Sequence, residues 1–227
     1  PLRYEADYFF SCSLKAGEWL FGKRIVQSDR YFTIKNAIDT QKYLFNRKQR
    51  SILRNQLRIE ADATVFIHVG RLHEAKNHIF LLYVFAMLIK EMPNSMLLLV
   101  GDGELSSEIQ KQIEQLNLQS NVKMLGARTD IPDMLNMADV FLFPSKWEGL
   151  PVTVVEAQAS GLPCFVSDKI TKEVGISELV RFLPIDKGAQ VWIDAIKETD
   201  LTRKNVIDKI IQAGFDIKES VEWLTTF

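Results

Sequence analysis

The sequence predicts an α/β protein built on a doubly wound parallel sheet. From about residue 64, short apolar runs alternate with longer amphipathic ones, which is typical of βα repeats around a parallel sheet. The apolar runs are rich in Val, Leu, Ile and Phe, as expected of strands that helices cover on both faces. The composition, 47% hydrophobic and 25% charged, is ordinary for a globular protein, so the chain has enough apolar side chains for a sizeable core.

The alternation gives the order of the elements. The expected strands are 65–69, 96–100, 122–125, 140–143, 163–166 and 179–183. The helices expected between them are 77–91, 105–116, 131–137 and 152–160, and Gly161 ends the last one. Ligands of such sheets bind beyond the carboxyl ends of the strands. We therefore expect the chemistry in the loops 70–77, 101–104, 126–130 and 144–151.

The two ends of the chain follow a different pattern. The first sixty residues predict a strand at 8–12, a helix at 15–21, a strand at 31–35 and a charged helix at 46–57. A single βαβ unit cannot bury both of its faces, so we expect it to pack on something absent from this chain or to be loosely tethered to the main domain. The tail predicts helices at 191–211 and 215–227, with Gly214 as the break. The chain begins with Pro1 rather than Met, so we expect it to be a piece of a longer one.

Charge and composition exclude several classes of function. A net charge of -1 gives no general attraction to nucleic acid, so any anion site must be local. The sequence has no apolar run of the roughly 18 residues that a membrane span requires. Cys12 and Cys164 lie in apolar runs, where they act as small hydrophobic residues, and they suit a reducing cytoplasm. His68, His73 and His78 are evenly spaced, but strand, loop and helix placement should scatter them, so we expect no metal site.

The segment from Glu148 to Glu156 carries two carboxylates around a predicted helix start. Pro151 suits a first helical turn, and the free N–H groups near Val152 and Thr153 would then stabilise an anion such as phosphate. Glu156 is flanked by apolar residues, so its ionised form needs hydrogen-bond donors, and two ribose hydroxyls would serve. The alternative is that Glu148 only offsets the helix dipole while Glu156 is a half-exposed helix residue or pairs with an arginine.

A second motif follows the first predicted strand. Gly70 ends the strand, and Arg71 and Lys76 precede the next helix. Two cations at the mouth of a cleft suit a diphosphate, because Arg71 offers a planar fork of donors and Lys76 a point charge. The alternative is a pair of solvated surface cations.

A third motif, Gly101 to Gly103, predicts a tight turn between strand and helix with a positive φ. It is half of a dinucleotide fingerprint, but Ser106 stands where a third glycine would fall. A nicotinamide-dependent oxidoreductase is therefore the weaker hypothesis.

Together these motifs resemble the retaining glycosyltransferases of family four, whose fold is called GT-B. The resemblance lies in their order and spacing along most of the chain, and the segment 34–39 looks like the connection between the two halves of that fold. The motifs are Gly70-Arg71 with Lys76, the turn 101–103, the stretch 121–126, and Pro144-Ser145 followed by 148–156.

The resemblance implies a division of the chain into three parts. Residues 41–214 would form a Rossmann-like donor-binding domain, the C-terminal half of a GT-B enzyme. Residues 1–40 would be a remnant of the N-terminal, acceptor-binding domain with the linker, and 215–227 a helix that crosses back to that domain.

The resemblance also implies the roles of the site residues. Arg71 and Lys76 would bind the diphosphate, Glu148 would contact the donor sugar, and Glu156 would take the ribose hydroxyls, with the region from Met124 to Arg128 facing the base. The donor-binding residues it implies, besides Glu156, are Gly70, Gly101, Gly103, Met124, Arg128, Gly149, Leu150, Pro151, Val152 and Thr153.

The implied activity is transfer of a sugar from a nucleotide diphosphate sugar, expected to be a UDP-sugar, to an acceptor hydroxyl. Configuration would be retained, with no metal and no cofactor, in bacterial capsular or exopolysaccharide synthesis. The acceptor would be a glycan or a lipid-linked glycan, in the cytoplasm or at the inner face of the membrane.

The chain departs from the family pattern in three ways. Ala37 stands where the family usually has glycine, and Leu150-Pro151 replaces a commoner aromatic-glycine pair. The acceptor site of the N-terminal domain is absent, so we expect donor binding without turnover. The alternative is a non-catalytic nucleotide-sugar-binding module.

Overall fold

The computed structural model describes residues 6–227, and the doubly wound sheet is confirmed. Six parallel strands lie in the order β5-β4-β3-β6-β7-β8. They are β3 (Thr64–Val69), β4 (Ser95–Val100), β5 (Val122–Met124), β6 (Val140–Phe143), β7 (Cys164–Ser167) and β8 (Val180–Leu183). Each begins and ends within one residue of its predicted bounds. Residues 1–5 of the predicted N-terminal segment lie outside the described residues.

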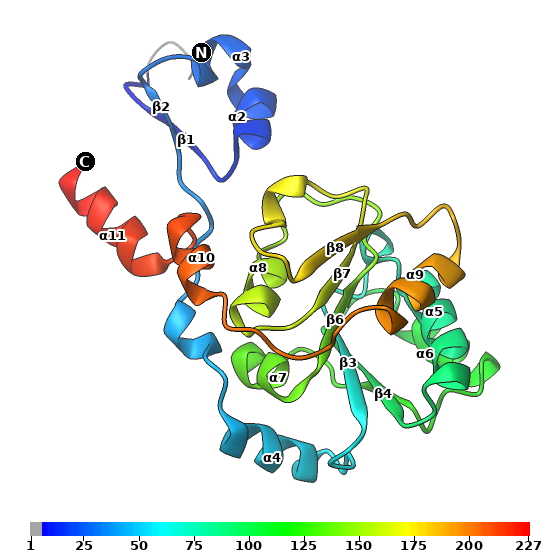
Figure 1. The fold of residues 1–227 in the computed structure, drawn as a ribbon. Helices are drawn as coiled ribbons and strands as arrows, with labels where there is room; N and C mark the ends of the chain where they lie inside the picture. The colour runs from blue at the N-terminus through cyan, green and yellow to red at the C-terminus, as the bar shows by residue number, and fades with distance from the viewer. Residues whose placement is uncertain (1–5) are drawn as a thin grey trace.

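Helices cover both faces of this sheet (Figure 1). One face packs against α5 (His78–Glu91), α6 (Ser106–Gln115) and α9 (Ala189–Lys197). The other packs against α7 (Ile131–Met137), α8 (Val152–Ala159), α10 (Ile207–Gln212) and α4 (Arg47–Gln56). Successive residues of β3 enter the two cores in turn: Val65 and Ile67 face one, Phe66 the other. This explains why the predicted strands are apolar throughout.

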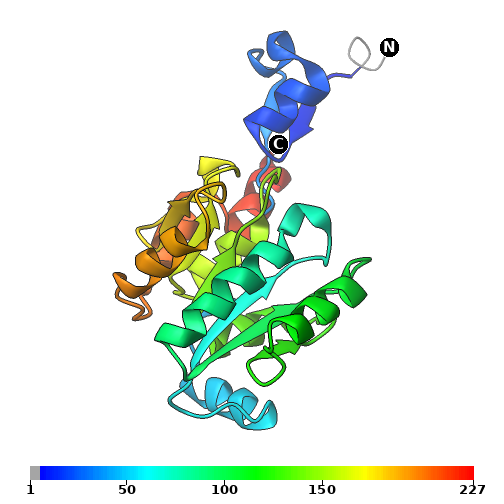
Figure 2. The ribbon, with the colours of Figure 1, turned by 90° about the vertical axis from the view of Figure 1, so that its right-hand side faces the viewer.

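The N-terminal part stands apart from the main domain (Figures 1 and 2). It consists of β1 (Phe9–Ser11), α2 (Leu14–Phe21), the unpredicted α3 (Lys23–Val26) and β2 (Tyr31–Thr33). β1 and β2 pair in parallel. Trp19 of α2 is 83% exposed and Leu14 is also exposed. As predicted, this βαβ unit leaves apolar side chains uncovered.

The C-terminal helix lies beside the N-terminal part. α11 (Ile217–Thr226) follows Gly214, whose φ of 75° makes the predicted break. The ring of Phe227, just after α11, has its centroid 4.9 Å from those of both Tyr8 and Phe32. The chain therefore returns at its end to the part where it began (Figure 1).

The chain crosses between the two parts twice, and the two crossings are bonded to each other. The Ile38 amide donates to the carbonyl of Phe215 at 2.8 Å, and the Ile217 amide donates to the carbonyl of Ile38 at 3.0 Å. Thr40, at the start of the 3₁₀ helix η1 (Thr40–Tyr43), donates to the Asp216 carboxylate at 2.5 Å. The two connecting segments are thus hydrogen-bonded to each other.

The predicted single helix at 191–211 is wrong. α9 ends at Lys197, α10 begins at Ile207, and the residues between them run without helical structure. The Arg203 guanidinium donates to three main-chain carbonyls at the C-terminal end of α7. The Lys204 amide donates to the Gly161 carbonyl at 3.2 Å. These tertiary hydrogen bonds hold the segment extended despite its helical pattern.

Within residues 6–227, no helix combines the length and the apolar character needed to cross a membrane.

Candidate functional site

The candidate site lies where the strand order reverses. β3 has β4 on one side and β6 on the other, so the loops after β3 and β6 meet at the switch point. A doubly wound sheet opens its ligand crevice at this place. The Thr153 hydroxyl donates to the carbonyl of Val69 at 3.5 Å, which brings the first turn of α8 to the end of β3.

The two loops at the switch point are bonded to each other. The Lys146 amide donates to the carbonyl of Ala75 at 2.7 Å, and the Asn77 side chain donates to the carbonyl of Pro144 at 3.2 Å. An exposed ion pair joins Lys146 to Glu74 at 2.9 Å. Both loops are therefore held in one arrangement by main-chain contacts and not only by side chains.

Lys76 and Glu148 form the central ion pair of the site. The Lys76 Nζ lies 2.6 Å from Glu148 Oε1, and the two side chains are only 16% and 14% exposed. The ammonium also lies 4.8 Å from the ring centroid of Phe143. The Lys76 stem passes over Gly70, where a Cβ would lie 3.0 Å from Lys76 Cε. Gly70 thus leaves the room that the lysine stem uses.

The start of α8 is open. Pro151 occupies the N-cap position, one residue before the predicted place, and the helix begins at Val152. No side chain among residues 6–227 caps it. The first amides of the helix therefore remain available to an anion. Gly149, just before this turn, faces open space.

Arg71 does not join this group. Its side chain is 71% exposed and pairs with Glu104 at 3.2 Å. Glu104 also lies 3.5 Å from the ring of His73. The structure thus brings together Gly70, Lys76, Glu148 and the first turn of α8, and it leaves the guanidinium of Arg71 outside that cluster. Glu104 is not among the predicted site residues, although it ends the loop 101–104, where chemistry was expected.

Gly101 and Gly103 are required by close packing of two loops. Gly101 has a φ of 140°, as the turn predicted, and a Cβ there would lie 2.0 Å from the carbonyl oxygen of Gly70. A Cβ on Gly103 would lie 2.4 Å from the carbonyl oxygen of Leu72. The Gly101 amide donates to the Gly126 carbonyl at 2.8 Å. These glycines bring the loop after β4 against the loop after β3.

The two side chains expected near the base have other partners. Met124 is partly buried and packs against the core under α5 and α6. Arg128 donates to both carboxylate oxygens of Asp130, at 2.8 and 2.6 Å. These hydrogen bonds hold the pKa of Asp130 below its usual value. In the described part of the chain, neither side chain forms a hydrogen bond with Lys76 or Glu148.

Glu156 has a partner that sequence reasoning did not find. The Tyr43 hydroxyl donates to Glu156 Oε1 at 2.5 Å. Burial raises the pKa of Glu156, and the hydrogen bond from Tyr43 opposes the rise. Burial also raises the pKa of Tyr43, so the phenol stays protonated as the donor. The two residues are 113 positions apart, so no local pattern in the sequence could have revealed the contact.

The expectation that the histidines are scattered is wrong for two of them. His68 of β3 and His78 of α5 are in edge-to-face contact, with ring centroids 4.7 Å apart. His68 Nδ1 donates to the carbonyl of Leu142 at 2.8 Å. Burial lowers the pKa of both, to about 4 for His78, so both are neutral at pH 7. The described residues contain no group of three or more metal-ligating side chains.

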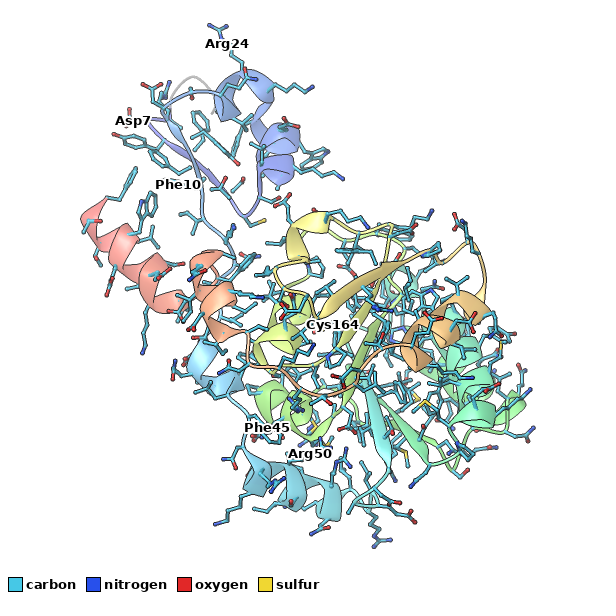
Figure 3. The ribbon with its side chains drawn as sticks, viewed as in Figure 1. Asp7, Phe10, Arg24, Phe45, Arg50 and Cys164 are labelled. Carbon is cyan, nitrogen blue, oxygen red and sulfur yellow. The ribbon has the colours of Figure 1, made fainter. Side chains whose placement is uncertain are left out.

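Two hollows lie away from these loops, beside the segment that joins η1 to α4. One of about 750 Å³ is lined by residues 41, 42 and 44–49 with Asp133 and Asn136. The other, of about 450 Å³, includes Phe45 and Arg203. Phe45 and Arg50 are labelled on this side in Figure 3. We place the site at the switch point because it carries the free amides and the shielded cation that a phosphate requires.

Comparison with known proteins gives the family. The model of the family described as glycosyl transferases group 1 matches residues 49–200. The Bacillus subtilis protein EpsF is 37% identical over 216 residues, which are 93% of this chain and 56% of EpsF. An Escherichia coli protein named as a UDP-Gal:alpha-D-GlcNAc-diphosphoundecaprenol alpha-1,3-galactosyltransferase is 32% identical over 199 residues, 83% of this chain and 51% of that protein.

A solved structure shows the same fold. The Anabaena protein HepE, in complex with UDP and glucose, superposes with a TM-score of 0.78 at 23% identity, over 99% of this chain and 63% of HepE. The chain thus spans between about half and two thirds of the length of these proteins. The chain belongs to the glycosyl transferases group 1, and its doubly wound sheet is that of the C-terminal half of a GT-B glycosyltransferase.

Proposed function

We propose that this chain is the donor-binding part of a retaining glycosyltransferase that moves a sugar from a UDP-sugar to an acceptor hydroxyl without a metal ion. The observation that carries the proposal is the shielded Lys76–Glu148 pair beside the open start of α8, at the switch point of the sheet. The names of the relatives support the donor, because one is a UDP-Gal transferase and another was crystallised with UDP. A Staphylococcus aureus relative, 30% identical over 168 residues, is named for capsular polysaccharide biosynthesis, which supports a role in capsule or exopolysaccharide synthesis.

Lys76 and α8 would hold the diphosphate. A lysine ammonium has three N–H donors, and Lys76 uses one of them on Glu148. The other two can donate to phosphate oxygens, together with the amides of Val152 and Thr153. Arg71 can join them because its pair with Glu104 is exposed to solvent, and ion pairs of that kind are weak. The positive charge gathered there would stabilise the diphosphate as it departs, as a divalent cation does in other enzymes.

The remaining residues would orient the sugar and the nucleoside. Only one oxygen of Glu148 is hydrogen-bonded within the described residues, so the other can accept from a hydroxyl of the donor sugar. Main-chain groups of Gly149 and Leu150 would meet the sugar, and Glu156 would accept from the ribose. In the transfer, the bond between the anomeric carbon and the diphosphate oxygen breaks, and a bond to the acceptor oxygen forms on the same face. The acceptor proton leaves with the diphosphate or to water.

Each of the three predicted parts of the chain would then have its own role in binding. Residues 41–214 would bind the donor, residues 1–40 would belong to the acceptor side, and 215–227 would tie the two together. The acceptor, a glycan or a lipid-linked glycan, would bind to a portion that the longer relatives have and this chain lacks. A lipid-linked acceptor would bring the enzyme to the inner face of the membrane. The chain alone would bind donor without turning it over.

Calorimetric titration with UDP, GDP and NAD tests the proposal. We expect a nucleoside diphosphate to bind and NAD to bind more weakly or not at all. Lys76→Ala should weaken UDP binding at least about tenfold, since a hydrogen bond between charged groups is worth roughly 1.5 to 3 kcal/mol. In a full-length enzyme the same variant should slow turnover by a similar factor.

Lys146→Ala is the matched control, because Lys146 lies in the neighbouring loop and forms an exposed pair with Glu74. It should leave the UDP affinity nearly unchanged. Tighter binding of NAD than of UDP, or an unchanged affinity in Lys76→Ala, would refute the assignment. A full-length protein that binds UDP but transfers no sugar would instead be a non-catalytic binding module.

A further inference from the structure

The contact between Tyr43 and Glu156 joins the 3₁₀ helix η1 to α8, the helix whose first turn lies in the candidate site. Tyr43 is the last residue of η1, and Glu156 lies in the second turn of α8. The hydroxyl lies 2.5 Å from Glu156 Oε1, and Tyr43 is only 7% exposed. The phenol ring belongs to the main apolar core, so its position is fixed by packing as well as by the hydrogen bond.

The segment that carries Tyr43 is anchored at both ends. Before it, Thr40 donates to the carboxylate of Asp216 at 2.5 Å. After it, the Asn46 amide donates to the Asn136 side chain at 3.1 Å, and that side chain donates back to the Asn46 carbonyl at 3.0 Å. The hydroxyl of Tyr43 is therefore a fixed donor. It is not a mobile side chain that happens to reach a carboxylate.

The hydrogen bond leaves part of the Glu156 carboxylate free. A carboxylate has about four acceptor positions, and the Tyr43 hydroxyl takes one of them, on Oε1. Within residues 6–227 no side chain or main-chain group donates to Oε2. A half-buried carboxylate with one fixed donor keeps a single orientation and still accepts two further hydroxyls. Without that donor, the same burial would favour rotation or protonation of the group.

We infer that Tyr43 is a positioning residue for ribose recognition, whose hydroxyl holds the Glu156 carboxylate in the orientation that accepts both hydroxyls of the nucleotide ribose. The inference rests on the proposed function, in which Glu156 receives the ribose. If the hydrogen bond between η1 and α8 were purely structural, its loss would lower stability. It would weaken the binding of a nucleotide with ribose hydroxyls and of one without them equally. That difference separates the two roles.

The test compares UDP with 2′,3′-dideoxy-UDP by calorimetry on the 227-residue chain and its variants. The unmodified chain should prefer UDP. Tyr43→Phe removes only the hydroxyl, and it should weaken UDP binding about tenfold while changing the affinity for the dideoxy analogue little. Glu156→Gln should lose the preference as well, and adding Tyr43→Phe to it should reduce the preference no further, because the two residues act as one unit.

Tyr83→Phe is the matched control, because Tyr83 is an exposed tyrosine of α5 on the other face of the sheet. It should keep the full preference for UDP. Melting curves of each variant check that it is folded. If Tyr43→Phe is unfolded at the assay temperature, the titrations are repeated at a lower temperature at which its melting curve shows it folded, and it should lose the preference there.

These titrations distinguish failure of the proposed donor site from failure of the role inferred for Tyr43. If UDP does not bind, or binds no better than the dideoxy analogue to the unmodified chain, the proposed donor site itself is wrong. If the unmodified chain prefers UDP and Glu156→Gln abolishes the preference, the donor site stands. The inference is then overturned if the folded Tyr43 variant keeps the full preference, or if it weakens both nucleotides equally.

Discussion

At the scale of single residues, burial decides the protonation of the two histidines below the site. His78 has no hydrogen-bond partner for either ring nitrogen among residues 6–227, and burial lowers its pKa to about 4. His68 donates to the Leu142 carbonyl and is also held neutral by burial. Both rings lie close to the charge of Lys76, which lowers their pKa values further. Because both rings are neutral, they add no positive charge beside Lys76, which pairs with Glu148.

This burial predicts the stability of the protein in acid. The folded-state pKa of His78 is depressed from 6.5 to about 4, so the unfolded chain binds more protons than the folded one in that range. The free energy of unfolding should therefore fall as the pH drops from about 6.5 to about 4, by up to about 3 kcal/mol from His78 alone. Urea unfolding curves across this range measure the fall.

His78→Leu should show a shallower fall, because the leucine cannot take up a proton and His68 alone remains. His73→Leu is the control, because His73 is half exposed and lies near Glu104. It should keep the slope of the unmodified chain. The account of the buried pair fails if His78→Leu and the unmodified chain lose stability equally.

The sequence predicted individual site residues where their signal is local. Lys76 and Glu148 each stand in a loop that follows a recognisable strand, so their meeting at the switch point could be expected from the strand order. The contact of Tyr43 with Glu156 could not be expected, because it depends on how a segment 113 positions away returns to the site. The orientation of Arg71 depends on its contact with Glu104.

At the scale of elements, the loops after β4 and β6 contain glycines for different reasons. Gly103 has no room for a side chain, since a Cβ would lie 2.4 Å from the main-chain oxygen of Leu72. Gly149 lies in the longer loop between β6 and α8, and nothing lies within 4 Å of its added Cβ. Packing thus constrains the first glycine, while we attribute the second to space for the donor.

Alanine substitutions separate these reasons. Gly103→Ala should lower the free energy of unfolding by about 2 kcal/mol or more, because main-chain atoms must shift. Gly149→Ala should change it by no more than about 0.5 kcal/mol. It should nevertheless weaken UDP binding, because the methyl group would project into the proposed donor site. Equal stability of the two variants in urea would contradict the packing argument.

The strands and the helices differ in how well the sequence predicts them. Buried parallel strands are continuous apolar runs with polar loops on either side, so their bounds can be predicted to within one residue. The segment between α9 and α10 has a helical pattern, but Arg203 finds better partners at the end of α7. Local propensity is a weak guide wherever such tertiary hydrogen bonds compete with it.

At the scale of the whole molecule, α11 connects the main domain to the N-terminal part. It leaves the main domain beside the linker and reaches β1 and β2 through the aromatic ring of Phe227. Phe10 lies on the same side of the N-terminal part (Figure 3), with its ring centroid 5.4 Å from that of Phe227. The N-terminal part has an uncovered apolar face, so this cluster contributes much of its order.

Phe227→Ala should therefore loosen the N-terminal part and leave the main domain unchanged. Hydrogen exchange should become faster at the amides of β2, while amides of β3 keep their protection. Tyr83→Ala, which removes an exposed ring from α5, is the control and should alter neither. Unchanged exchange in β2 after Phe227→Ala would show that the contacts of Phe227 are not needed to order the N-terminal part.

The sequence predicted the overall plan of the molecule because the order of its elements alternates so regularly. It also predicted that the first βαβ unit would have an uncovered face, from the size of that unit alone. It could not predict the parallel bridge between Ile38 and Asp216, where the two connecting segments meet. Neither segment alone has a sequence pattern that indicates this pairing.

A crystal structure of the chain with UDP is the most direct test of the account. We expect the diphosphate within hydrogen-bond distance of Lys76 Nζ and the first amides of α8, and the ribose hydroxyls on the Glu156 carboxylate. UDP bound instead in the hollow lined by residues 41, 42 and 44–49, or a diphosphate remote from Lys76, would contradict the central claim.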